Sequence, residues 1–172
     1  PKALTCMIHA RKRGRGEISL EDTHPFIHHG VILAHNGIIY GFNRFPSLVK
    51  PIGKTDSEMF LCLIAEAYIS GSNIYKALES AIDAIDMASS INSIIIFLSE
   101  RKLVVLNMFF STPESCPEYY TMWLRRGEEE FIVSSEPLGE SSDWERLAES
   151  PGERVIVEAS IGDPKSIRIV RG

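Results

Sequence analysis

Two adjacent amphipathic helix patterns stand in the middle of this chain, between strand-like segments, and this order constrains the fold most strongly. Thr55-Asp56-Ser57-Glu58 matches a reciprocal capping box, and apolar residues then recur at spacings of three and four until Gly71, which predicts a helix. Asn73 can cap a second helix over residues 74–88, where the same spacing continues. Short polar turns separate the strand-like segments and favour antiparallel neighbours. The sequence therefore predicts an α+β fold with segregated layers.

The strand-like segments flank the two helices. The first covers residues 4–11, and Asn36-Gly37 between two apolar runs predicts a hairpin turn, because both residues tolerate positive φ. After the helices we expect strands at residues 93–98, 103–109, 119–124, 131–134, 154–159 and 167–170. No repeat or composition shift marks a second domain, so residues 1–172 are expected to form a single domain. Because a strand begins almost at Pro1, we also expect that upstream sequence is missing.

Charge and apolar patterning exclude two classes of function. The chain has 18 basic and 23 acidic residues, for a net charge of −5, which is the wrong sign for a general nucleic-acid binder. No apolar run reaches the roughly 18 residues that a membrane span requires. The three cysteines are odd in number and lie far apart, which indicates reduced thiols and a cytoplasmic protein.

Three places in the sequence have both a chemical and a structural interpretation. Asn36-Gly37 offers a side-chain amide and an unshielded N–H, which could hold an oxyanion or simply form the turn. Asp56 could bind a substrate ammonium or complement the helix dipole. Arg11, in a cluster of basic residues, could clamp a carboxylate or lie exposed in a loop.

The histidines and cysteines do not form a predicted reaction centre. Four histidines lie within twelve residues, but an extended chain directs His24 and His28 to one face and His29 and His35 to the other. We therefore expect no metal site. None of the thiols has the surroundings of a nucleophile, so the cysteines are expected to be structural; they are Cys6, Cys62 and Cys116.

Several motifs taken together resemble the class II glutamine amidotransferases, which are N-terminal-nucleophile (Ntn) hydrolases, and most closely their small stand-alone members. The resemblance covers about residues 8–138. Its motifs are His9-Ala10-Arg11-Lys12, Gly16, Thr23-His24-Pro25-Phe26, Ala34-His35-Asn36-Gly37-Ile38, Thr55-Asp56-Ser57-Glu58 and Ser134-Ser135-Glu136-Pro137-Leu138. It implies a four-layer αββα sandwich with antiparallel sheets, here lacking its first strands, and a single type-2 amidotransferase domain truncated at its N-terminus.

The resemblance also assigns roles to individual residues. Arg11 would clamp the α-carboxylate of glutamine, and Asp56 would take its α-ammonium. Asn36-Gly37 would form the oxyanion hole over the side-chain amide. Lys12 and His24 are further candidate substrate-binding residues. No metal and no organic cofactor is implied.

The sequence departs from the family pattern in two ways. The family nucleophile is a cysteine at position one of the mature chain, whose α-amine acts as general base, whereas this chain begins with Pro1. The nucleophile is therefore expected upstream of Pro1, and this chain alone is expected to be inactive. Arg13-Gly14 stands where the family usually has Ala-Thr, which alters the expected wall of the substrate pocket.

These features predict hydrolysis of the glutamine side-chain amide to glutamate and ammonia through a cysteine thioester. The ammonia is either released or passed to a partner protein. Two alternatives stay open: an inactive Ntn-fold module that binds an amino acid or a protein, and an Ntn hydrolase acting on another amide. No nucleic-acid or membrane partner is expected, and the sequence specifies no oligomeric state.

Overall fold

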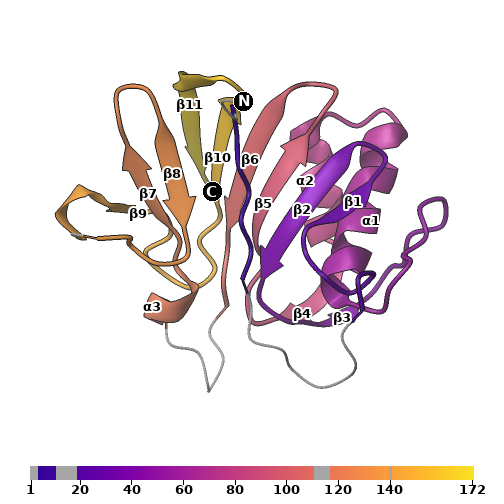
Figure 1. Ribbon diagram of the computed structural model, residues 1–172. Helices are drawn as coiled ribbons and strands as arrows, with labels where there is room; N and C mark the ends of the chain where they lie inside the picture. The colour runs from indigo at the N-terminus through magenta and orange to yellow at the C-terminus, as the bar shows by residue number, and fades with distance from the viewer. Residues whose placement is uncertain (1–3, 11–18, 111–116, 140) are drawn as a thin grey trace.

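The structure is a computed structural model that describes residues 4–10, 19–110, 117–139 and 141–172. Its centre is a six-stranded sheet in the order β1-β2-β5-β6-β10-β11, with every neighbouring pair antiparallel (Figure 1). The strands are β1 (Phe26–His28), β2 (Val31–Asn36), β5 (Asn92–Phe97), β6 (Lys102–Asn107), β10 (Val155–Ser160) and β11 (Asp163–Arg171). The α+β class with antiparallel sheets is confirmed.

Two helices, α1 (Asp56–Ile69) and α2 (Ile74–Ile82), pack on one face of this sheet (Figure 1). Both predicted caps are formed, because Thr55 Oγ1 accepts from the Glu58 N–H at 3.1 Å and Asn73 Oδ1 accepts from the Lys76 N–H at 3.0 Å. The capping box also predicts that the Glu58 side chain reaches back to the backbone of Thr55, and this prediction is wrong. The Glu58 carboxylate instead accepts from the N–H groups of residues 52 and 53, at 2.9 and 2.7 Å, and fixes the loop before the helix.

A second sheet, in the order β8-β7-β9, covers the opposite face of the six-stranded sheet (Figure 1). Its strands are β7 (Trp123–Arg126), β8 (Phe131–Ser134) and β9 (Glu145–Arg146). Alternation along β6 divides the core, since Val104 and Leu106 pack toward the helices and Val105 packs toward Leu124 of the second sheet. Among the described residues, the layers are helices, sheet and sheet. Outside these layers lie the short α3 (Pro117–Tyr120), the short η1 (Ser141–Asp143) and a separate two-stranded sheet described below.

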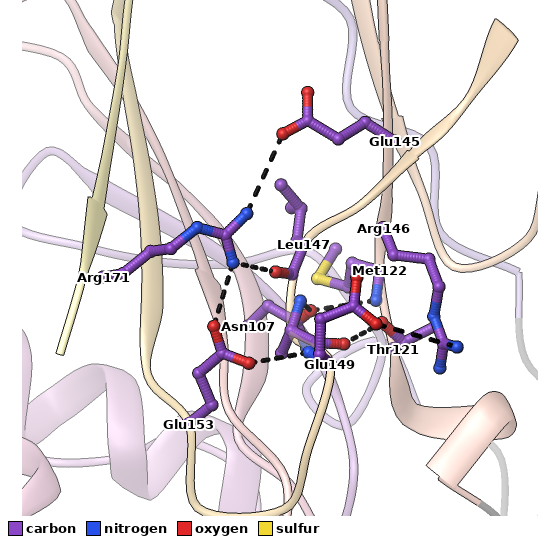
Figure 2. A network of polar contacts seen from close by, with 10 residues as sticks. Asn107, Thr121, Met122, Glu145, Arg146, Leu147, Glu149, Glu153 and Arg171 are labelled. Carbon is purple, nitrogen blue, oxygen red and sulfur yellow. Dashed lines mark hydrogen bonds and ion pairs between the residues drawn. The ribbon is translucent and has the colours of Figure 1, made fainter.

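Two buried asparagines join the sheets. Asn107 is fully buried, and its Nδ2 donates to Asn92 Oδ1 at 2.7 Å and to the Tyr120 carbonyl at 3.2 Å. Its Oδ1 accepts from the N–H groups of Met122 and Ala148, at 3.0 and 2.9 Å (Figure 2). Every polar atom of the Asn107 side chain is thus used within the protein. We call Asn92 and Asn107 with these backbone partners the asparagine bridge.

The predicted hairpin at Asn36-Gly37 is wrong. After Asn36 the chain leaves the main sheet, and β3 (Ile39–Phe42) pairs instead with β4 (Ile85–Ala88) in a separate two-stranded sheet. The hairpin that does form joins β1 to β2 through His29 and Gly30, whose φ angles are 48° and 78°. Positive φ at both central residues is the requirement of a tight two-residue turn.

Three other boundaries differ from the prediction. The second helix ends at Ile82, and the following apolar residues belong to β4, whose pairing with β3 overrides the helical spacing. The segment 119–124 is divided between α3 and β7. Residues 5–10 form no regular strand, and residues 8–10 line the site described next. Residue 11 lies outside the described residues.

Candidate functional site

A cleft of about 460 Å³ lies where the two sheets meet, on the face of the main sheet that points away from the helices. Alternation along β2 explains its floor, because Val31 and Leu33 pack under the helices while Ala34 and Asn36 face the cleft. Residues 8–10 and the strip from Val133 to Glu136 form its sides. Gly37 and Ser57 complete the end where the chain leaves β2.

The backbone from Asn36 to Ile39 is held by hydrogen bonds from three side chains. Ser90 Oγ donates to the Asn36 carbonyl at 2.5 Å, and Ser89 Oγ accepts from the Ile38 N–H at 3.0 Å. Asp56 Oδ2 accepts from the Ile39 N–H at 2.7 Å. We call these three side chains the turn clamp. It fixes the segment in which the chain leaves β2 of the main sheet and enters β3 of the two-stranded sheet.

Two hydrogen-bond donors of this segment are left over. Among the described residues, neither the Asn36 side-chain amide nor the Gly37 N–H bonds to the protein, and both residues line the cleft. A side chain at Gly37 is excluded, because a Cβ there would overlap the Ser90 carbonyl oxygen and φ is +152°. Two adjacent donors on a cleft are the equipment needed to hold a developing oxyanion.

His35 supports the same end of the cleft from within. Its ring is 3% exposed, with Nε2 3.1 Å from the Ser90 carbonyl and Nδ1 2.8 Å from Ser57 Oγ. Because a carbonyl only accepts, Nε2 carries the proton and Nδ1 accepts from the serine hydroxyl. Burial lowers the pKa of His35, so the ring is held neutral. Sequence reasoning missed this pair; the only signal was that each residue stands beside a predicted site residue.

The structure brings some of the predicted site residues together. Asn36 and Gly37 lie side by side on the cleft, and Asp56 holds the backbone two residues further on, although its side chain is not part of the cleft lining. His24 is buried and stacks on His9, a cleft residue, with ring centroids 4.2 Å apart. The predicted Arg11 and Lys12, and the altered pair at 13–14, lie outside the described residues.

The other predicted candidates have individual partners. His28 Nε2 lies 2.8 Å from Glu58 Oε1, so His28 and His35 take part in different contacts. Cys62 is buried in α1, where burial and the nearby Glu58 raise its thiol pKa to about 12, which is unsuited to forming a thiolate. Cys6 is exposed and is not part of the cleft lining, and Cys116 lies outside the described residues.

The described part of the chain also bears on metals and membranes. No group of three or more histidine, cysteine, aspartate or glutamate side chains is arranged there to hold a metal ion. None of the described helices combines the length and apolar character that crossing a bilayer requires.

Comparison with known proteins identifies the family. The model of the class II glutamine amidotransferases matches residues 2–98, which is more than half of the chain. The chain therefore belongs to the class II glutamine amidotransferases. Asn36, Gly37 and Asp56 all fall within the matched region, and β7, β8 and β9 fall outside it.

Individual relatives agree with this assignment. Two bear the name "putative glutamine amidotransferase": one from Haemophilus influenzae is 39% identical over 70 residues, and YafJ of Escherichia coli is 36% identical over 66. These matches cover 38% and 36% of this chain but 24% and 26% of the relatives, so the chain matches about a quarter of their length. The glutamine–fructose-6-phosphate aminotransferase (isomerizing) of Xylella fastidiosa is 30% identical over 82 residues, 45% of this chain and 14% of that protein.

The fold has a solved counterpart. A crystal structure described as a predicted glutamine amidotransferase, from Pseudomonas aeruginosa, superimposes with a TM-score of 0.60. The match covers 84% of this chain and 64% of that one, at 21% sequence identity. The likeness shows that the two chains share a fold.

Proposed function

We propose that the cleft binds glutamine and that the full-length protein hydrolyses its side-chain amide to glutamate and ammonia. The observation that carries this proposal is the pair of unused donors, the Asn36 amide and the Gly37 N–H, on the cleft of a chain in this family. A carboxamide carbon attacked by a nucleophile develops negative charge on its oxygen. Two fixed donors stabilise that charge more in the transition state than in the bound amide.

The attacking group in this proposal is the thiolate of a cysteine outside residues 1–172. Its attack on the amide carbon gives a tetrahedral oxyanion, from which ammonia leaves with a proton as the thioester forms. Water then attacks the thioester and releases glutamate. No described cysteine suits this role, because Cys62 is buried with a raised thiol pKa and Cys6 lies off the cleft.

Recognition of the amino-acid end is assigned to charged groups. Arg11 would pair with the α-carboxylate and Asp56 with the α-ammonium, while Lys12 and His24 would complete the binding site. Asp56 can serve both the fold and the substrate, since Oδ2 holds the Ile39 N–H and the carboxylate has a second oxygen. No cofactor takes part in this scheme, and the ammonia is either released or taken up by a partner protein.

The first experiment measures glutamate release from glutamine by the full-length protein, together with glutamine affinity by calorimetry. Asn36→Ala should lower turnover roughly 10²-fold with little change in affinity, because the lost donor acts mainly on the transition state. Asn43→Ala is the matched control, since its exposed amide bonds only to the Asp83 carbonyl. Equal losses of turnover and affinity in Asn36→Ala would contradict an oxyanion role.

The second experiment tests the ammonium site with Asp56→Asn, which keeps an oxygen for the Ile39 N–H and removes the charge. In this variant the affinity for glutamine should fall. The affinity for a glutamine analogue without the α-amine should stay unchanged, because that analogue has no ammonium group for Asp56 to bind. Loss of affinity for both compounds would instead indicate a structural role for Asp56. Glutamine binding without glutamate release would support the inactive module, and release from another amide alone would support the second alternative.

A further inference from the structure

We infer that Ser90 is a positioning residue that aims the Gly37 N–H into the cleft, and that His35 holds Ser90 in place. The inference rests on the proposed function, because it concerns one of the two proposed oxyanion donors. It adds a residue from a different segment, the short loop between β4 and β5. Nothing in its neighbourhood in sequence marks Ser90 as part of the site.

The first step is the geometry of one peptide group. The Asn36 carbonyl and the Gly37 N–H belong to the same peptide, and this peptide is trans. In a trans peptide the C=O and N–H bonds point in opposite directions. Ser90 Oγ donates to the carbonyl at 2.5 Å from the buried side, so the N–H, at the opposite edge of the same peptide plane, points away from Ser90 Oγ. Gly37 lines the cleft and Ser90 does not.

The second step is how Ser90 is held. Its side chain is fully buried, and its own carbonyl accepts from His35 Nε2 at 3.1 Å. The His35 ring is fixed at its other nitrogen by Ser57 Oγ at 2.8 Å. The chain of contacts therefore runs from the first turn of α1 through His35 and Ser90 to the Asn36 carbonyl. The absence of a side chain at Gly37 allows the Ser90 carbonyl to approach this closely.

The test uses Ser90→Ala in the full-length protein, with Ser93→Ala as the matched control. Ser93 is equally buried and also donates to a backbone carbonyl, that of Ile91 at 2.9 Å, but it does not touch the Asn36–Gly37 peptide. Ser90→Ala should lower kcat by roughly 10-fold or more with KM within about twofold, because a misaimed donor weakens transition-state binding. Ser93→Ala should lower the melting temperature comparably and leave kcat within about twofold of wild type.

A second variant keeps the test decisive if Ser90→Ala does not fold. Ser90→Cys preserves the shape with a weaker donor, so its kcat should lie between those of Ala and wild type. Equal kcat in wild type, Ser90→Cys and Ser93→Ala would overturn the inference. Asn36→Ala run in parallel separates the two proposals: if it lowers kcat and Ser90→Ala does not, only the positioning role fails. If neither variant alters kcat, the oxyanion hole itself is wrong.

Discussion

The turn clamp and the asparagine bridge are two polar clusters beside the main sheet, but they use their hydrogen-bonding groups differently. In the asparagine bridge, Asn107 makes two donor and two acceptor contacts, all to the protein. Around the turn clamp, the backbone is held just as firmly, yet the Asn36 amide and the Gly37 N–H have no partner among the described residues.

This difference separates polar groups that hold the fold from those available for chemistry. A fully paired buried amide has no capacity left for a ligand, so its removal should appear in stability. An unpaired donor at the surface of a cleft contributes little to stability and can meet a ligand at small reorganisation cost. The two clusters lie close together, because Asn36 and Asn92 are directly paired across β2 and β5. Substitutions at the two sites should therefore have opposite signatures.

The largest expected effect is on stability, at the asparagine bridge. Asn107→Ala leaves the buried N–H groups of Met122 and Ala148 without an acceptor and opens a cavity between the sheets. We expect the free energy of unfolding to fall by about 3–5 kcal/mol, measured by urea denaturation. The exposed Asn43→Ala is the control and should cost less than about 0.5 kcal/mol. If Asn107→Ala lowers the free energy of unfolding by less than about 1 kcal/mol, the asparagine bridge does not stabilise the fold as proposed, and the two clusters do not differ in this way.

The next effect is on activity, at the turn. In Gly37→Ala the new Cβ would overlap the Ser90 carbonyl oxygen, so the peptide that carries the proposed donor must move. Turnover of glutamine by the full-length protein should fall by about 10²-fold or more. Gly71→Ala is the control, since Gly71 also has positive φ, +96°, but nothing lies within 4 Å of its Cβ position. Gly71→Ala should lower the free energy of unfolding by about 1 kcal/mol and leave turnover unchanged. Equal turnover in Gly37→Ala and Gly71→Ala would show that the position of the Asn36–Gly37 peptide does not matter for activity.

Much of the fold could be predicted from local signals. The helix starts at Thr55 and Asn73 were correct because N-cap geometry depends on a few neighbouring residues. The hairpin at Asn36-Gly37 was wrong because the partner of the next strand is β4, about 45 residues later, and the turn clamp comes from three distant side chains. Local sequence cannot specify such a choice.

In the candidate site, too, the residues with a local sequence signal could be predicted, and those defined by distant contacts could not. Motifs predicted roles for Asn36, Gly37 and Asp56, since their residue types stand in a recognisable order along the chain, and the structure places Asn36 and Gly37 on the cleft. His35 and Ser90 were not predicted as site residues, because a buried histidine and a serine next to another serine have no local signature. Their contact joins residues 55 positions apart, and only the packed sheet brings them together. The predictions for Arg11 and Lys12 remain predictions.

A smaller effect should appear in the pH dependence of stability. Burial lowers the pKa of His35 below its ordinary 6.5, so the unfolded chain takes up a proton before the folded one does. The contribution of the neutral ring is complete above pH 6.5 and is lost as the pH falls below it, by at most about 1.4 kcal/mol per pH unit. In denaturation experiments between pH 6.5 and 5, His35→Gln should reduce the slope of the free energy of unfolding against pH. The control His29→Gln, at an exposed histidine, should leave that slope unchanged. An unchanged slope in His35→Gln would mean that folding does not change proton binding by His35, which would contradict a lowered pKa.

The smallest effect is expected at the exposed margin of the second sheet. Glu145 lies 3.6 Å from Arg126 there. It also lies 3.8 Å from Arg171 (Figure 2). Its side chain is 48% exposed, so solvent screens both pairs, and Glu145→Gln should change stability by less than about 0.5 kcal/mol. Glu153 is the sharper comparison, because it accepts from Arg171 at 2.9 Å and from the Glu149 N–H at 2.7 Å. In urea denaturation at low salt, Glu153→Gln should lower the free energy of unfolding more than Glu145→Gln does. In 1 M salt the difference between the two variants should become smaller. A larger loss at Glu145 would show that ion-pair number, rather than hydrogen-bond geometry and burial, sets the stability of this margin.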